Sequence, residues 1–227
     1  MNRNIVLFFC LISLSIFGQT LENITTDRPD HSEGTYIIPQ RNLQFENGFV
    51  LSKNGAAYEF MLRYGTFKGN EVRLESELNY TADKLNHNGL TLSSKQKILN
   101  QDNFFPSVTV VGYLEYEYAT KTINPDLLLA FESEFDRLFF VTNIGTKNRI
   151  DTGIFTFQSG VVLSDKFTLY GEYFLLFSKS TAPNHGFDGG MLFLLQSHLQ
   201  IDLSGGGSYI DNSFFAYVSA GVSILFR

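Results

Sequence analysis

Apolar and polar residues alternate from Arg41 to the end of the chain, in segments of about nine to fifteen residues separated by Gly, Asn, Asp, Ser and Lys clusters. A period of two residues puts successive side chains on opposite faces of an extended chain, so it predicts β-strands. The predicted strands are 41–52, 55–66, 70–81, 89–99, 105–119, 126–135, 137–147, 151–163, 166–179, 185–196, 198–207 and 213–227. Their number is even, as single-chain bacterial barrels require.

The last segment shows the pattern most clearly, because one face is apolar over its whole length: Phe214, Ala216, Val218, Ala220, Val222, Ile224 and Phe226. The other face carries Tyr217, Ser219, Gly221, Ser223 and Arg227. Alternation alone does not distinguish a membrane barrel from a soluble two-sheet sandwich, because both cover one face of each strand.

Three features favour the barrel. Charged residues occupy the middle of the polar faces, as expected when lipid is outside and water inside. The segments suit a tilted bilayer span, whereas ordinary strands average about five or six residues. Short connections (67–69, 100–104, 136, 164–165, 197) alternate with mostly longer ones (82–88, 120–125, 148–150, 180–184, 208–212). The sequence predicts a closed antiparallel transmembrane β-barrel of about twelve strands, with both chain ends in the periplasm.

The turn at 67–69 predicts a register. With Gly69 in the left-handed conformation, Arg63 lies opposite Arg73 and Glu59 opposite Glu77. Because like charges face each other, we expect diagonal ion pairs such as Arg63 with Glu75 and Arg73 with Glu59 inside the barrel.

The N-terminus has the layout of a secretory signal peptide: Arg3, an apolar run from Ile5 to Phe17, then Gly18. The apolar run is too short to span a membrane as a helix, which needs roughly twenty residues. We therefore divide the chain into a signal peptide (1–18), an N-terminal periplasmic segment (19–40) and an outer-membrane barrel (41–227).

Composition excludes several classes of function. The only cysteine, Cys10, lies in the signal peptide, so the mature chain has no disulfide, thiol nucleophile or thiolate metal site. The formal net charge is −6, without a basic cluster, which argues against nucleic acid as a partner. No cofactor is predicted.

Several motifs in order resemble a family of bacterial outer-membrane proteins labelled as putative transporters of the phenol-degradation (meta) pathway. They are Thr25-Thr26-Asp27-Arg28-Pro29-Asp30, Pro39, Leu43 to Phe49, Leu90-Thr91-Leu92 with Lys95, Pro106-Ser107, Glu172, Asp188-Gly189-Gly190, and Leu199 to Ser204 with Gly205 and Gly207. The similarity covers nearly the whole mature chain and implies an outer-membrane barrel that acts as a solute channel. The final Arg227 and the position of His31 depart from the pattern, and no functional residue is carried over.

The acidic and basic residues before the first strand have two interpretations. Asp27, Arg28 and Asp30 form a small plug in the periplasmic mouth, where Arg28 meets lumen acids, or they form a turn whose direction Pro29 fixes.

The inward charged residues also have two interpretations: they line a cation-preferring pore, or they neutralise each other and fill a narrow barrel. The candidate lumen residues are Glu46, Glu59, Arg63, Arg73, Glu75, Glu77, Glu115, Glu117, Glu132, Glu172, Asp188 and Asp202, with Lys95, Lys97 and Glu134 on the same faces. Tyrosines near strand ends predict an aromatic girdle at the lipid headgroups, with an aromatic-substrate pathway as the alternative: Tyr58, Tyr80, Tyr116, Tyr118, Tyr173 and Tyr209.

No catalytic or metal site is predicted. His31 and His198 each have a serine neighbour, but adjacent residues on a strand point to opposite faces. A hydrolase would require a fold that brings a serine and a histidine within hydrogen-bond reach, which we do not expect.

The predicted function is therefore that of an outer-membrane β-barrel, not an enzyme, that passively carries an unidentified small solute. The alternative is a structural or surface-binding barrel that uses loops 82–88, 120–125 and 180–184. The expected partners are the lipid bilayer, the solute, and the barrel assembly machinery during insertion.

Overall fold

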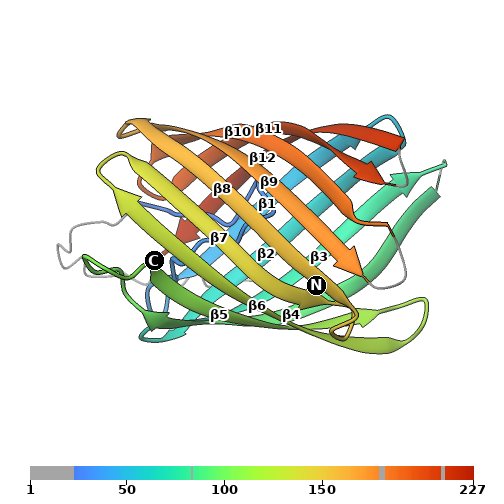
Figure 1. Cartoon of the computed structure of the whole chain (residues 1–227), viewed down its shortest axis with the longest axis horizontal. Helices are drawn as coiled ribbons and strands as arrows, with labels where there is room; N and C mark the ends of the chain where they lie inside the picture. Colours follow the sequence, from blue (N-terminus) through green and yellow to red (C-terminus); the bar gives the residue numbers. More distant parts are fainter. Residues whose placement is uncertain (1–22, 83, 179–181, 211–212) are drawn as a thin grey trace, which may run out of the picture.

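The chain forms one closed, twelve-stranded antiparallel barrel. The computed structural model describes residues 23–82, 84–178, 182–210 and 213–227, so the predicted signal peptide lies outside the described residues. The strands are β1 (Leu43–Ser52), β2 (Gly55–Phe67), β3 (Asn70–Thr81), β4 (Lys84–Leu99), β5 (Ser107–Glu117), β6 (Thr122–Phe135), β7 (Leu138–Lys147), β8 (Thr152–Ser164), β9 (Phe167–Ser178), β10 (Asn184–Gln196), β11 (Leu199–Ile210) and β12 (Ser213–Phe226). Each strand pairs with its neighbours in sequence, and β1 pairs with β12 (Figure 1). Within these residues, no helix is long and apolar enough to cross a membrane.

The predicted register between β2 and β3 is confirmed. Arg63 lies opposite Arg73, Glu59 lies opposite Glu77, and Gly69 has the expected positive φ of 79°. Each predicted segment overlaps one strand.

The expected alternation of short and long connections is partly wrong. Residues 84–88 and 122–125 extend β4 and β6, which leaves only 82–83 and 118–121 as connections. The longest connection, 100–106, lies at the end predicted to carry the short turns. The strands extend into polar sequence because Lys84 pairs with Thr81 and Thr122 with Glu117, so the hydrogen-bonded ladder continues beyond the apolar band.

The two faces of the wall differ as the alternation predicts. Large apolar side chains are exposed on the exterior of every part of the barrel, including Phe49, Leu51, Leu114, Leu127, Ile144, Phe187, Ile201, Leu203 and Val218. Fully or almost fully buried polar side chains point inward, including Gln44, Glu46, Arg63, Glu71, Arg73, Lys95, Thr109, Asn143 and Thr156. A barrel with this exterior matches lipid rather than water. The sheet closes on itself, so the two-sheet sandwich is excluded.

Part of the inner wall is apolar, which the sequence analysis did not anticipate. Val111, Leu128, Ala130 and Ile154 form a buried cluster on β5, β6 and β8. The interior therefore combines charged side chains with an apolar patch on β5, β6 and β8.

The predicted girdle tyrosines lie on the exterior, so they do not form a pathway through the lumen. Tyr80, Tyr116, Tyr118 and Tyr209 are exposed near the ends of their strands. They belong to a band of ring contacts, such as Tyr209 with Phe214 at 5.0 Å between centroids. This position fits aromatic residues at a lipid headgroup layer.

A lysine on the exterior should destabilise the barrel. Val218 lies within β12 and is 55% exposed. A basic side chain facing the middle of a bilayer costs about 2–4 kcal/mol, so we expect Val218→Lys to lower the free energy of unfolding in lipid vesicles by an amount of this order. Urea titration of the folded fraction measures it, with Val218→Leu as the control of equal polarity. Equal stability of the lysine variant would contradict a lipid-facing position.

Candidate functional site

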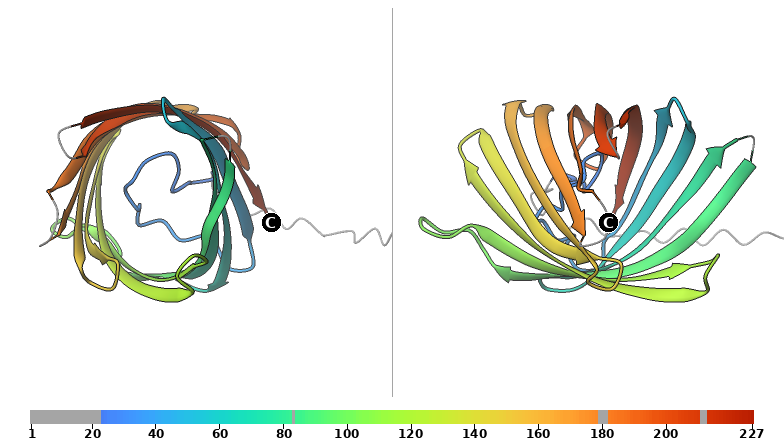
Figure 2. Two further views of the ribbon diagram at one scale, coloured as in Figure 1. Left: turned by 90° about the vertical axis from the view of Figure 1, so that its right-hand side faces the viewer. Right: turned by 45° about the vertical axis from the view of Figure 1, so that its right-hand side comes forward.

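Residues 23–42, which we call the lumen segment, precede β1 and lie inside the barrel (Figure 2). The predicted plug residues Asp27, Arg28 and Asp30 belong to this segment. Its side chains and backbone contact a residue of every strand. In order from β1 to β12, these partners are Glu46, Arg63, Arg73, Lys95, Tyr113, Glu132, Asn143, Thr156, Glu172, Asp188, Gln200 and Ser219.

A small apolar cluster holds the two ends of the segment at one mouth of the barrel. Ile24 and Ile38 pack against Leu225 of β12, and all three are buried. The backbone amide of Ile24 donates to the carbonyl of Ser197 at 2.8 Å, and that of Arg41 donates to the carbonyl of Gly65 at 2.8 Å. The segment therefore enters and leaves the lumen at the same end, the one at which β1 begins and β12 ends.

Asp27 and Glu33 of the segment bind three cations of the wall. Asp27 forms an ion pair with Arg63 at 3.1 Å and accepts hydrogen bonds from Arg73 at 3.1 Å and Lys95 at 3.0 Å. Glu33 accepts two hydrogen bonds from the Arg73 guanidinium, at 2.7 and 3.0 Å, and one from Lys95 at 3.2 Å. The three cations are completely buried. Because an unpaired buried charge is very unfavourable, these pairs fix the position of the segment.

The wall supplies further acids to the same cations. Glu46 and Glu71 accept from Arg63 at 2.7 and 2.9 Å. Carboxylates thus outnumber cations, and burial raises the pKa of Asp27 to about 6, although Arg63 and Lys95 act in the opposite direction. Burial also disfavours ionised Glu33, but Arg73 and Lys95 outweigh it and hold the pKa of Glu33 well below its ordinary value.

Arg28 binds the part of the wall next to this cluster, on β2, β11 and β12. Its guanidinium pairs with Glu59 of β2, donates to Ser219 of β12 at 2.8 Å and lies 3.5 Å from Asp202 of β11. Gly48 makes room for it, because a Cβ atom at this position would overlap the guanidinium group. This is the contact between Arg28 and lumen acids that the plug interpretation requires.

Asp30 has acidic neighbours and, within the described residues, no basic partner. It accepts a hydrogen bond from Gln158, and its other oxygen is buried without a hydrogen-bond partner. Burial, followed by the charges of Glu172 and Asp188, raises the pKa of Asp30 well above its ordinary value. No group of three or more metal-binding side chains with metal-site geometry occurs among the described residues.

We predict that Asp30 loosens the lumen segment at high pH. A carboxyl group whose pKa is raised in the bound segment stabilises the bound state. This stabilisation is complete below the ordinary pKa of 3.8, and it is lost as the pH rises through the raised pKa. Asp30→Asn should therefore hold the segment more tightly than the wild type at pH 8.5, and equally at pH 4. Hydrogen exchange of residues 24–38 at the two pH values measures this, with the exposed loop variant Asp151→Asn as the control. A pH-independent difference would contradict the mechanism.

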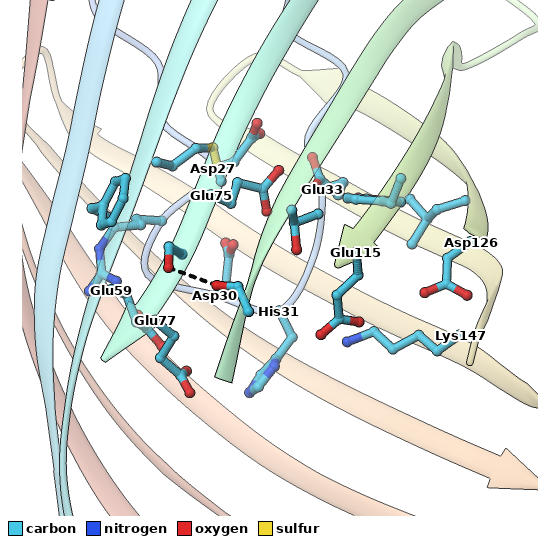
Figure 3. A pocket seen from close by; sticks show the side chains of 18 of the residues that line it. Asp27, Asp30, His31, Glu33, Glu59, Glu75, Glu77, Glu115, Asp126 and Lys147 are labelled. Carbon is cyan, nitrogen blue, oxygen red and sulfur yellow. Dashed lines mark hydrogen bonds and ion pairs between the residues drawn. The ribbon is translucent and has the colours of Figure 1, made fainter. Parts of the chain in front are cut away.

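Two cavities flank the lumen segment. The outer cavity, of about 660 Å³, is lined by residues of the segment and of β1–β8 and β12, towards the end at which β1 ends and β2 begins. Figure 3 shows the acidic side chains that line it, together with Lys147. The inner cavity, of about 490 Å³, opens near the turns at 136–137 and 165–166. Arg28 and Asp30 line both cavities, so they separate the two halves of the lumen.

All but one of the predicted lumen residues fall into two groups. The first contacts the lumen segment: Glu46, Glu59, Arg63, Arg73, Glu132, Glu172, Asp188 and Asp202. The second lines the outer cavity without contacting the segment: Glu75, Glu77 and Glu115. Glu117 lies in neither group, because it accepts from Thr120 at the strand end.

The expected diagonal pairs are not formed. Arg63 binds Glu71 rather than Glu75, and Arg73 binds Glu33 rather than Glu59. The lumen segment causes this difference, since it brings its own carboxylates to the arginines and its own arginine to Glu59.

Sequence reasoning missed several contributors. Glu33 and Thr35 of the segment, Glu71 of β3 and Asn143 of β7 all bond within the lumen. Glu71 had a detectable signal, because it shares its strand face with Arg73 and Glu75. Nothing in the local pattern indicates which wall strand Glu33 or Thr35 reaches.

Contrary to expectation, the fold brings a serine and a histidine within hydrogen-bond reach. Ser76 Oγ of β3 lies 2.5 Å from His87 Nε2 of β4, where a β-bulge interrupts the pairing of the two strands. The serine hydroxyl also lies 2.9 Å from the carbonyl oxygen of Gly89. Among the described residues, no carboxylate contacts His87, so the pair lacks the third group that orients a catalytic histidine.

No protein-family model and no curated protein matches the sequence. Solved structures match the fold. The COG4313 outer membrane channel from Pseudomonas putida F1 has a TM-score of 0.66 at 9% identity, over 89% of this chain and 100% of that one. This chain therefore shares the barrel fold of that protein.

Two porins have similar scores. The KdgM porin, solved in complex with disordered oligogalacturonate, has a TM-score of 0.63 at 12% identity, over 81% of this chain and 99% of that one. The NanC porin has a TM-score of 0.62 at 11% identity, over 80% of this chain and 98% of that one. At such identities the likeness concerns the barrel alone.

Proposed function

We propose that the protein is a passive channel of the outer membrane that carries a small solute through its lumen, with residues 19–40 as a plug and 41–227 as the barrel. The observation that carries this proposal is the pair of cavities on either side of the lumen segment, within a wall whose exterior is apolar. A solute that crosses has to pass Arg28 and Asp30, which line both cavities. The barrel assembly machinery is the expected route of insertion, and the lipid bilayer is the partner of the exterior.

The charge of the lumen favours a cationic or neutral solute over an anion. Oligogalacturonate, present in the KdgM structure, is a polyanion, whereas the outer cavity of this chain carries eight carboxylate and only two Arg or Lys side chains. The resemblance to phenol-degradation transporters implies an aromatic or apolar solute, and the apolar inner wall at Leu128 and Ile154 provides a surface for one.

The alternative, a structural or surface-binding barrel, has less support. Most of the residues in two of its three predicted binding loops, 82–88 and 120–125, belong to strands. The connections of two to four residues at 53–54, 118–121 and 148–151 offer little surface for a partner.

Planar bilayers distinguish the two functions. We expect the purified, heat-modifiable barrel to give stepwise conductance in potassium chloride and, under a salt gradient, a reversal potential that indicates cation preference. A correctly folded barrel without conductance would support the structural alternative, and anion preference would contradict the proposed role of the lumen acids.

A further inference from the structure

Acidic side chains from several strands of one part of the wall line the outer cavity. Glu75 and Glu77 belong to β3, whereas Glu115 and Asp126 belong to β5 and β6 (Figure 3). Among the described strands, only Lys147 of β7 contributes a Lys or Arg side chain to the cavity, since Arg28 belongs to the segment. A site with one sign of charge in a low-dielectric enclosure attracts the opposite ion strongly.

Part of this acidity is already neutralised by the protein. Asp27 and Glu33 bind wall cations, Glu59 pairs with Arg28, and Glu75 lies 3.5 Å from Arg73. By contrast, Glu77, Glu115 and Asp126 form no ion pair within the described part of the chain. One oxygen of Asp30 is in addition buried without a hydrogen-bond partner. The cavity therefore keeps uncompensated negative charge after its internal pairs are formed.

The same cavity has an apolar wall. Leu128 of β6 and Ile154 of β8 line it, and both belong to the buried cluster that includes Val111 and Ala130. Tyr113 lies beside this cluster and also lines the cavity. Uncompensated carboxylates and a buried apolar surface thus border one space of about 660 Å³, within the range of roughly 300–1,000 Å³ typical of small-molecule sites.

We propose that the outer cavity is a binding site for a small organic cation with an apolar body, such as an arylalkylammonium ion. The ammonium group binds among Glu77, Glu115 and Asp126, and the apolar body packs on Leu128 and Ile154. This inference rests on the proposed channel function only for its physiological meaning, because binding to the cavity does not require transport.

Calorimetry on the detergent-solubilised barrel at pH 7.5 tests the proposal with four probes: phenethylammonium, its neutral analogue 2-phenylethanol, the anion phenylacetate, and ethylammonium, which lacks the ring. We expect phenethylammonium to bind at least fivefold more tightly than each of the other three. Equal binding of 2-phenylethanol would overturn the role of charge, and equal binding of ethylammonium would overturn the role of the apolar wall. Preference for phenylacetate, or no binding of any probe, would overturn the whole proposal.

Variants locate the site. The double variant Glu77→Gln/Glu115→Gln should weaken phenethylammonium binding about fivefold or more, since each partly exposed ion pair contributes up to about 1 kcal/mol. Ile154→Thr should weaken it without changing ethylammonium binding. Asp151→Asn, an equal loss of charge in a loop that lines neither cavity, should have no effect. Heat-modifiable migration establishes that each variant is folded, and a folded double variant with wild-type affinity would overturn the assignment.

Conductance separates this inference from the channel proposal. A barrel that conducts potassium but does not prefer phenethylammonium refutes the ligand class and keeps the channel. A barrel that binds phenethylammonium at this site but gives no conductance refutes the channel and keeps the binding site.

Discussion

A barrel that lacks residues 24–38 is expected to conduct several times more current per channel than the full-length barrel. These residues contact all twelve strands and separate the outer from the inner cavity, so their removal joins the two cavities into one water-filled lumen. The wall charges that they leave behind gain water as a partner, and the exterior apolar face that holds the barrel in lipid is unchanged. Single-channel recording in planar bilayers measures the effect.

A single substitution provides the matched test. A leucine at Gly48 would occupy the space of the Arg28 guanidinium. Gly48→Leu should therefore displace this part of the segment and raise the conductance towards that of the deletion, with Gly112→Ala as the control, because a Cβ atom there meets nothing within 4 Å. Wild-type conductance in both the deletion and Gly48→Leu would show that the segment does not limit passage.

Loss of the Glu33 carboxylate should release the lumen segment. In Glu33→Ala, Arg73 loses its bidentate partner, Lys95 loses one of its two carboxylates, and the Tyr113 hydroxyl loses its acceptor at 2.6 Å. Breaking a buried ion pair by removing one partner costs about 3–5 kcal/mol, so we expect a loss of this order in the free energy that holds the segment. Hydrogen exchange of residues 24–38, followed by mass spectrometry, measures it.

Glu33→Gln is the graded control, because the amide keeps one acceptor oxygen, whereas it loses the charge and the second acceptor. Its exchange should lie between those of the wild type and Glu33→Ala. Glu117→Gln, at a strand end away from the segment, should exchange like the wild type. If Glu33→Ala also does so, the cation cluster does not hold the segment.

The barrel was predictable because a period of two residues determines which side chains share a face. Arg63 and Arg73 were placed inside and opposite each other from this period and one glycine turn. Strand ends were less predictable, since the polar residues Lys84 and Thr122 continue the backbone ladder without any apolar signal.

The partners of the inward charges were not predictable from local pattern. Arg63 and Arg73 were expected to pair across the strands, but Glu33, Asp27 and Glu71 compete for them. The residues of the segment have no periodicity, so their positions depend on the assembled wall. The apolar inner cluster was missed for a related reason. The alternation does not show that Val111 and Ile154 point into the lumen, because this depends on how the closed barrel brings β5, β6 and β8 together.

The contacts of Arg28 depend on the closure of the barrel. Its partners Glu59, Asp202 and Ser219 come from β2, β11 and β12, on either side of the seam where the first and last strands of the sheet join. Before β1 and β12 pair, these three acceptors do not lie in one continuous part of the sheet, so Arg28 cannot bind all of them. Arg28 thus gains its full set of contacts only when β1 and β12 have paired, and these contacts then link the two sides of the seam.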